Sequence, residues 1–243
     1  MTATPQTSVR EIVAEDFRAA AVFEHFGIDF CCGAGRRTLG EACRDRNVNP
    51  LDVMIEVNQA CERADQTTPR FSQWGTDALI AYIVRHHHGY VRRVLPPLVS
   101  HVRKVASAHG VKHPELVEVA VIFEEVADEM TAHLDKEEEV LFPYIEQLQI
   151  ALRLGDPVPR APFGAVDKPI AMMEEEHEHA GEAMRRIREL TAGYTPPPGA
   201  CTTYGVCLRE LEEFERDLHE HVHLENNVLF PKARTLAQDS LAV

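Results

Sequence analysis

The sequence has little that would direct it to a membrane, to nucleic acid or to an oxidising compartment. Its 243 residues include one tryptophan, and no apolar run approaches the roughly 20 residues of a membrane-spanning helix. The net charge of −14 disfavours binding to a phosphate backbone. The first residues lack a basic stretch followed by an apolar one, and six cysteines without a secretory signal indicate free thiols. We therefore expect an acidic, soluble, cytoplasmic protein that binds neither nucleic acid nor membrane.

Helical patterns dominate the chain and predict an all-α protein of two domains. Residues 1–65 are expected to form a small helical domain, and residues 66–77, with three threonines, a proline and a glycine, a linker. Residues 78–237 contain four long amphipathic segments, followed by a tail at 238–243. These segments span about 78–109, 114–147, 167–192 and 202–237. Turn-rich connections between four such helices predict an up-down-up-down bundle.

Capping patterns mark the helices of the small domain. Ser8 with Glu11, and Thr38 with Glu41, fit the capping box, in which two side chains and two backbone N–H groups bond reciprocally. The first helix is expected to run unbroken from Ser8 to a stop at Gly27.

An internal repeat lies within the four long segments. HLDKEEEVLFP begins at His133 and HVHLENNVLFP at His221, 88 residues later, with His, Glu, Val, Leu, Phe and Pro aligned without a gap. The preceding helices carry His88 and His177, which are 89 residues apart. One helical hairpin used twice predicts an approximate two-fold axis through the bundle.

Helical phase places ionisable residues in the middle of apolar stripes. On the second long segment, for example, the stripe continues through Val140 and Tyr144. Burying a carboxylate there without a partner would cost several kcal/mol or force its protonation. The ionisable residues on the stripes of the last three long segments are His133, Glu137, His177, His221 and Glu225.

A metal ion resolves the cost of burying these groups together. Histidine four residues before glutamate places both side chains on one helix face, close enough to share an ion. Two such pairs and two single histidines supply four imidazoles and two carboxylates, a mixed set that suits iron or manganese better than structural zinc. Six ligands are too few to fill two six-coordinate metals, so we expect bridging carboxylates, an oxo or hydroxo bridge and a position for an exogenous ligand.

Periodicity leaves the histidine of the first long segment open. His88 and His87 fit its apolar stripe about equally well. His179, His219 and His223 lie off their stripes and are predicted to face solvent. The acidic runs at 137–139 and 174–176 are predicted to be mostly solvated, with Glu137 as the exception.

A second chemical signal is the adjacent pair Cys31 and Cys32 in a glycine-rich loop. Adjacent cysteines rarely bond to each other, because the intervening peptide is too short for relaxed disulfide geometry. The pair is interpreted either as two small packed residues or as thiolates for redox exchange or iron transfer. Cys43 and Cys61 are predicted to be structural. We assign no role to the remaining two cysteines.

Several long motifs resemble the iron–sulfur cluster repair di-iron proteins, the Repair of Iron Centres family. FEHFGIDFCCG at 23–33 is similar to the signature of that family's small N-terminal domain. Five further motifs of this chain are similar to the hemerythrin-like domain of that family. They are HHGYVRRVLPPL, HLDKEEEVLFP, MEEEHEHAG, TPPPGACTTY and HLENNVLFP. The similarity covers nearly the whole chain, in the same order. The glycine loop after Cys32 is one residue longer than the family's usual double glycine.

The resemblance implies a non-haem di-iron centre, oxo- or hydroxo-bridged, with Glu137 and Glu225 as bridging carboxylates. It also favours His88 over His87, because the family's ligand is the second histidine before Gly89 and Tyr90. The implied ligands are His88, His133, Glu137, His177, His221 and Glu225. Oxygen-carrying hemerythrins have a fifth histidine, so reversible oxygen carriage is not implied.

The function implied by the resemblance is repair of iron–sulfur clusters damaged by nitric oxide or peroxide, by donation of iron from the centre. The implied partners are damaged iron–sulfur proteins and small ligands such as NO or O2, and the chain is expected to be a monomer or a homodimer. Two other functions stay open: reduction of nitric oxide at the di-iron site, and sensing of a small molecule by the metals.

Overall fold

The computed structural model describes residues 3–31, 35, 37–62, 69–158 and 161–240. Apart from one isolated bridge between Ser8 and Thr38, the regular structure of these residues is helical, which confirms the all-α class. The chain forms two compact units, residues 1–79 with 222–243 and residues 80–221. Within the described ranges, no helix has both the length and the apolar character needed to cross a membrane.

The N-terminal region contains short helices whose starts follow the predicted caps. Ser8 accepts a hydrogen bond from the backbone N–H of Glu11, whose carboxylate accepts one from the backbone N–H of Ser8. Thr38 and Glu41 form the same capping box. The helices are α1 (Val9–Glu15), α2 (Ala19–His25), α3 (Leu39–Arg46) and α4 (Pro50–Glu62).

The prediction of one unbroken helix from Ser8 to Gly27 is wrong, because the chain turns at Asp16. Asp16 has extended backbone angles, and its carboxylate accepts hydrogen bonds from the backbone N–H and the Nε of Arg18 at 3.1 and 2.8 Å. A short polar side chain that bonds its own backbone two residues later offers an alternative to the helical hydrogen bond. The break separates α1 from α2.

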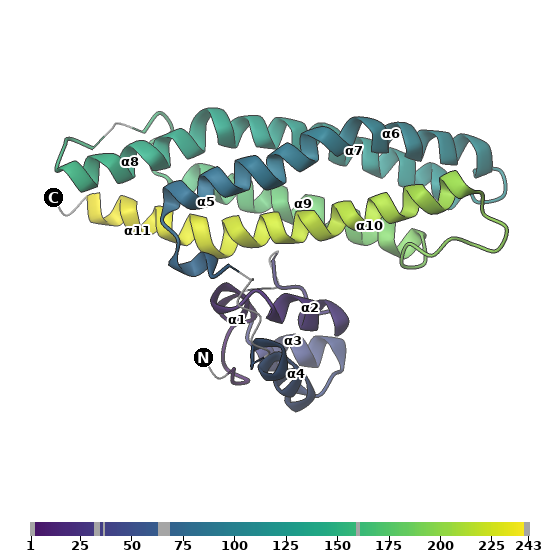
Figure 1. Ribbon diagram of the computed structural model, residues 1–243, viewed down its shortest axis with the longest axis horizontal. Helices are drawn as coiled ribbons and strands as arrows, with labels where there is room; N and C mark the ends of the chain where they lie inside the picture. Colours follow the sequence, from purple (N-terminus) through teal and green to yellow (C-terminus); the bar gives the residue numbers. More distant parts are fainter. Residues whose placement is uncertain (1–2, 32–34, 36, 63–68, 159–160, 241–243) are drawn as a thin grey trace. The chain divides into compact units, whose positions relative to one another are not determined.

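Long helical runs pack side by side as a bundle (Figure 1). The described residues form four such runs, and three of them contain a π-helical segment. The first run follows the short 3₁₀ turn η2 (Phe71–Gln73) and consists of α5 (Thr76–Ile83), η3 (Val84–His88) and α6 (Gly89–His109). The second consists of α7 (Glu115–Lys136), η4 (Glu137–Leu141) and α8 (Phe142–Leu154). The third is α9 (Asp167–Leu190). The fourth consists of α10 (Thr202–His223), η5 (Leu224–Leu229) and α11 (Phe230–Ser240).

The bundle has the predicted up-down-up-down arrangement, with α7 packed against both α6 and α9. Gly155 ends α8 with a φ of +70°, a conformation that glycine adopts without the strain of a Cβ atom. The rings of Phe123 and Phe214, both fully buried, meet edge to face with centroids 5.4 Å apart. Burying one such side chain stabilises the fold by about 1.5–3 kcal/mol. The buried histidines His133 and His221 lie on the same two helices as these rings, α7 and α10.

Candidate metal centre

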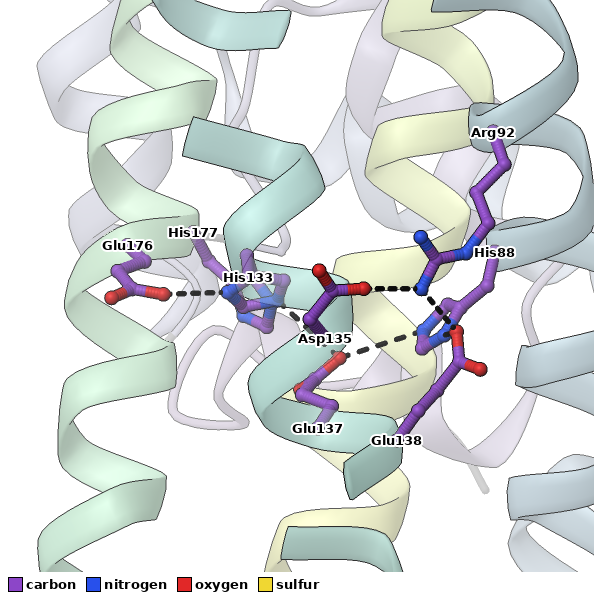
Figure 2. A network of polar contacts seen from close by, with 8 residues as sticks. All are labelled: His88, Arg92, His133, Asp135, Glu137, Glu138, Glu176 and His177. Carbon is purple, nitrogen blue, oxygen red and sulfur yellow. Dashed lines mark hydrogen bonds and ion pairs between the residues drawn. The ribbon is translucent and has the colours of Figure 1, made fainter. Parts of the chain in front are cut away.

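Glu137 is the buried carboxylate at the middle of the bundle. Its side chain is 0% exposed, and its Oε2 lies 3.4 Å from Nε2 of His133, one helical turn earlier. The Nε2 of His88, from the first run, lies 3.5 Å from the same oxygen. Figure 2 shows Glu137 between these two imidazoles. One carboxylate therefore faces two imidazoles that come from two helices.

The other predicted histidines complete the cluster. The Nε2 of His177, on α9, lies 3.0 Å from the Nε2 of His133. The ring of His221, on α10, lies 5.0 Å from that of His88, centroid to centroid. Glu225 follows His221 by one turn of the same helix and is fully buried.

The predicted residues fall into two groups of four buried side chains. The first group is His88, Glu137, His221 and Glu225, and the second is His133, Glu137, His177 and Glu225. Within each group, one ligand atom per residue lies within 4.8 Å of the others. Both groups contain Glu137 and Glu225, which is the arrangement expected for two ions joined by two shared carboxylates.

Each π-helical segment contains one of these residues and changes the helical phase there. The backbone N–H of Phe142 donates to the carbonyl of Glu137, five residues earlier, and that of Phe230 donates in the same way to Glu225. From the end of η4 onward the buried stripe consequently passes through Leu141 and Ile145. The predicted place of Val140 on that stripe is wrong, since its side chain is 43% exposed. π-Helical turns occur frequently at functional sites.

Carboxylates beside the cluster orient two of its histidines (Figure 2). The Nδ1 of His88 donates to Glu138 at 2.9 Å, and the Nδ1 of His133 donates to Glu176 at 2.8 Å. The hydrogen bond from His133 is the main reason that the pKa of Glu176 is lowered to about 2, with Lys136 also contributing. Carboxylate partners of this kind set the tautomer of a metal-binding histidine. The prediction that both acidic runs are mostly solvated missed these two contacts.

His87 is buried next to His88 but belongs to neither group of four. Its Nδ1 bonds to Asp217 at 3.0 Å, and its ring stacks on that of His221 with centroids 5.6 Å apart. Both histidines that periodicity left open are therefore buried, but only His88 lies beside Glu137.

His223 is not at the surface, contrary to the prediction. Its side chain is 1% exposed, and its ring packs against that of Phe17 with centroids 5.0 Å apart. Burial lowers the pKa of His223 to about 3, with a smaller contribution from the charge of Arg10. The neutral ring accepts a hydrogen bond from the side-chain amide of Asn227 at 3.0 Å. His179 is exposed, as predicted, and His219 is partly buried.

Cys31 is held by the residues that follow Glu225. The side-chain amide of Asn226 donates to the carbonyl of Cys31 at 3.0 Å, and that of Asn227 donates to the carbonyl of Phe30 at 3.1 Å. Cys31 itself is 4% exposed. Cys32 and the following two loop residues lie outside the described residues, so the predicted role of the pair stays a prediction. Cys43 and Cys61 lie in α3 and α4.

The four-helix bundle and its histidine and glutamate cluster define a hemerythrin-like cation-binding protein. Residues 79–233 match the family model of the hemerythrin HHE cation-binding domain, and residues 5–61 match that of ScdA_N, a domain of unknown function. The iron-sulfur cluster repair protein ScdA of Staphylococcus haemolyticus is 34% identical over 94% of this chain and 98% of its own length. The repair protein YtfE of Yersinia pestis is 36% identical over 89% and 91%. The chain belongs to this family of iron–sulfur cluster repair proteins.

Proposed function

We propose that the two buried groups hold a pair of iron ions and that the protein repairs damaged iron–sulfur clusters by donating iron from this pair. The single observation that carries the proposal is the sharing of Glu137 and Glu225 by both groups. The family relationship indicates that the substrates are iron–sulfur clusters, because the relatives are named as cluster repair proteins.

The donor set fits iron. Each group offers two imidazoles and two carboxylates, the mixed nitrogen and oxygen ligation that suits iron or manganese. Burying the charged carboxylates of Glu137 and Glu225 costs a large desolvation free energy, and a divalent cation between them offsets this cost. The groups contain no thiolate, unlike many structural zinc sites.

Two carboxylates next to the cluster set which ring nitrogen of His88 and of His133 is free of a proton. Glu138 and Glu176 keep a proton on Nδ1 of His88 and His133, so that the unprotonated Nε2 of each ring faces Glu137. Bound iron supplies a centre that changes oxidation state and takes a small ligand such as NO or O2. Few protein ligands per ion favour the release of iron to an acceptor.

The proposal extends to organisation and partners. Residues 1–65 form the cysteine-bearing domain, 66–77 the linker, 78–237 the di-iron bundle and 238–243 the tail. Cys31 and Cys32 pass iron to the acceptor. The clients are damaged iron–sulfur proteins of the cytoplasm, and the protein works as a monomer or a homodimer, without nucleic acid or membrane.

The test measures iron and repair together. Protein purified without oxygen is assayed for two irons per chain, and Mössbauer spectra of its reduced and oxidised forms identify a coupled pair. The loaded protein is then mixed with an NO-damaged [4Fe–4S] enzyme. Donation predicts that client activity returns as iron leaves the chain in proportion. Continuous formation of nitrous oxide without iron loss would instead show an NO reductase, and ligand binding with neither effect would show a sensor.

A further inference from the structure

Cys201 is an exposed thiol at the start of α10, far from the metal centre. Its carbonyl accepts a hydrogen bond from the backbone N–H of Gly205 at 3.2 Å, which makes Cys201 the N-cap residue of that helix. His221 lies 20 residues further along, about 30 Å at 1.5 Å per residue. Chemistry at Cys201 is therefore separate from chemistry at the metals.

A tight turn fixes the position of Cys201. The backbone N–H of Ala200 donates to the carbonyl of Pro197 at 3.0 Å, and Gly199 has a φ of +81°. This is the pattern of a type II β-turn, with proline at the second position and glycine at the third. The turn in the proline-rich segment thus fixes the backbone of Cys201 at the N-terminal end of α10.

His109, the last residue of α6, lies against this thiol. Its Nε2 is 3.2 Å from the Sγ of Cys201, although 92 residues separate them in sequence. The imidazole is also held by a ring contact with Tyr204, which is buried, with centroids 5.3 Å apart. A base is thereby placed within hydrogen-bond distance of an exposed sulfur.

The other described cysteines lack this combination. Burial raises the pKa of Cys61 to about 11 and that of Cys207 to about 12, and it also raises the pKa of Cys43. Cys31 is buried. Thiolate is the nucleophilic form of cysteine, and reactive thiols are typically exposed, close to histidine and at helix N-termini. Among the described cysteines, Cys201 alone meets these three conditions.

We propose that Cys201 and His109 form a reversible thiol-modification site whose reaction partner is a low-molecular-weight disulfide such as oxidised glutathione. His109 takes the thiol proton, and the Cys201 thiolate attacks one sulfur of the disulfide. A new S–S bond forms at Cys201 and the reagent's S–S bond breaks. The departing thiolate carries away the electron pair and takes the proton from His109. The sulfur of Cys201 is oxidised and the departing sulfur is reduced, so the exchange needs no other reactant.

The experiment measures the rate of modification at Cys201 itself. The full-length protein is incubated with oxidised glutathione at neutral pH, quenched with acid and mapped by peptide mass spectrometry. The reference is a synthetic peptide of residues 195–206, which contains the same cysteine without His109 or a stable helix. The peptide lacks the imidazole that takes the thiol proton, and the thiolate is the form that attacks a disulfide. We expect Cys201 to react at least about threefold faster in the protein than in the peptide.

A matched pair of variants tests the histidine. His109→Gln keeps a polar side chain but removes the base, and we expect its rate at Cys201 to fall to that of the peptide. His101→Gln is the control, because His101 lies on the same helix and bonds to Glu210 at 2.6 Å instead. Equal rates for the two variants would overturn the role of His109. A wild-type rate no higher than that of the peptide would overturn the site without any variant. Neither result depends on iron content, so each is distinct from a failure of the proposed function.

Discussion

Glu176→Gln probes how far the metal centre depends on a residue that does not belong to either ligand group. Glu176 accepts a hydrogen bond from Nδ1 of His133 at 2.8 Å, and it forms an ion pair with Lys136. The amide keeps the size of the side chain but loses the charge that holds the proton on Nδ1. Removing such a partner typically weakens metal binding by about 10–100-fold, or about 1.4–2.8 kcal/mol.

The structure favours the lower end of that range. Glu176 is 30% exposed, so water screens part of its charge, and the glutamine oxygen still accepts a hydrogen bond. His133 belongs to only one of the two groups. We therefore expect one of the two irons to bind about tenfold more weakly while the other is little changed.

The assay is anaerobic competition for Fe(II) with a chromogenic chelator, which resolves two binding steps. The control is Glu175→Gln, which makes the same change of charge at an exposed neighbour on the same helix. If the two variants bind both irons equally, the carboxylate of Glu176 does not support His133. Equal weakening of both irons would show that the effect is not local.

Four further predictions concern the metals and the thiols. Glu137→Ala should lower bound iron below two per chain by elemental analysis, with helical circular dichroism retained; two irons in this variant would exclude bridging. His88→Ala should lose iron or the absorption of an oxo bridge whereas His87→Ala keeps both, and the reverse outcome would exchange their roles. Replacing Cys31 and Cys32 together by serine should reduce cluster repair at unchanged iron content; full repair would make the cysteine loop structural. Removing iron with a chelator should lower the thermal midpoint, because buried ligands lose their shared ion, and scanning calorimetry with and without iron checks this.

Helical periodicity predicted the ligand stripes because those contacts repeat along single helices. His133 and Glu137 are four residues apart in one apolar stripe, and the same spacing recurs at His221 and Glu225. The repeat made the pattern specific, since two copies in register have no ordinary packing explanation. These are local features, and a regular helix carries them without knowledge of its neighbours.

The phase change after Glu137 was missed because the prediction used one period throughout. Pro143 was the available signal, since it lacks the N–H that an α-helix would bond to the carbonyl of Glu139. The ring also crowds that carbonyl, and a π turn relieves both problems by adding one residue. Pro231 stands at the same place in the second copy.

The other omissions depend on contacts between distant segments. Glu176 reaches His133 from another helix, and nothing in the sequence of the run at 174–176 distinguishes it from Glu174 and Glu175. His223 lies off the ligand stripe, but its ring is covered by Phe17 from a segment more than 200 residues earlier. A stripe assigned from one helix cannot show which second surface packs against it.

The π turns have a consequence for anyone who builds a metal site of this kind into a new scaffold. Grafting His133 and Glu137 onto an ordinary α-helix would copy their spacing but leave the helix beyond them about 100° out of rotation, which is the angle of one residue. Leu141 and Ile145 would then turn away from the core that they fill here. The unit to transplant is the whole segment from His133 to Pro143, in which one extra residue lets the same helix line a metal site and then pack as a hydrophobic core.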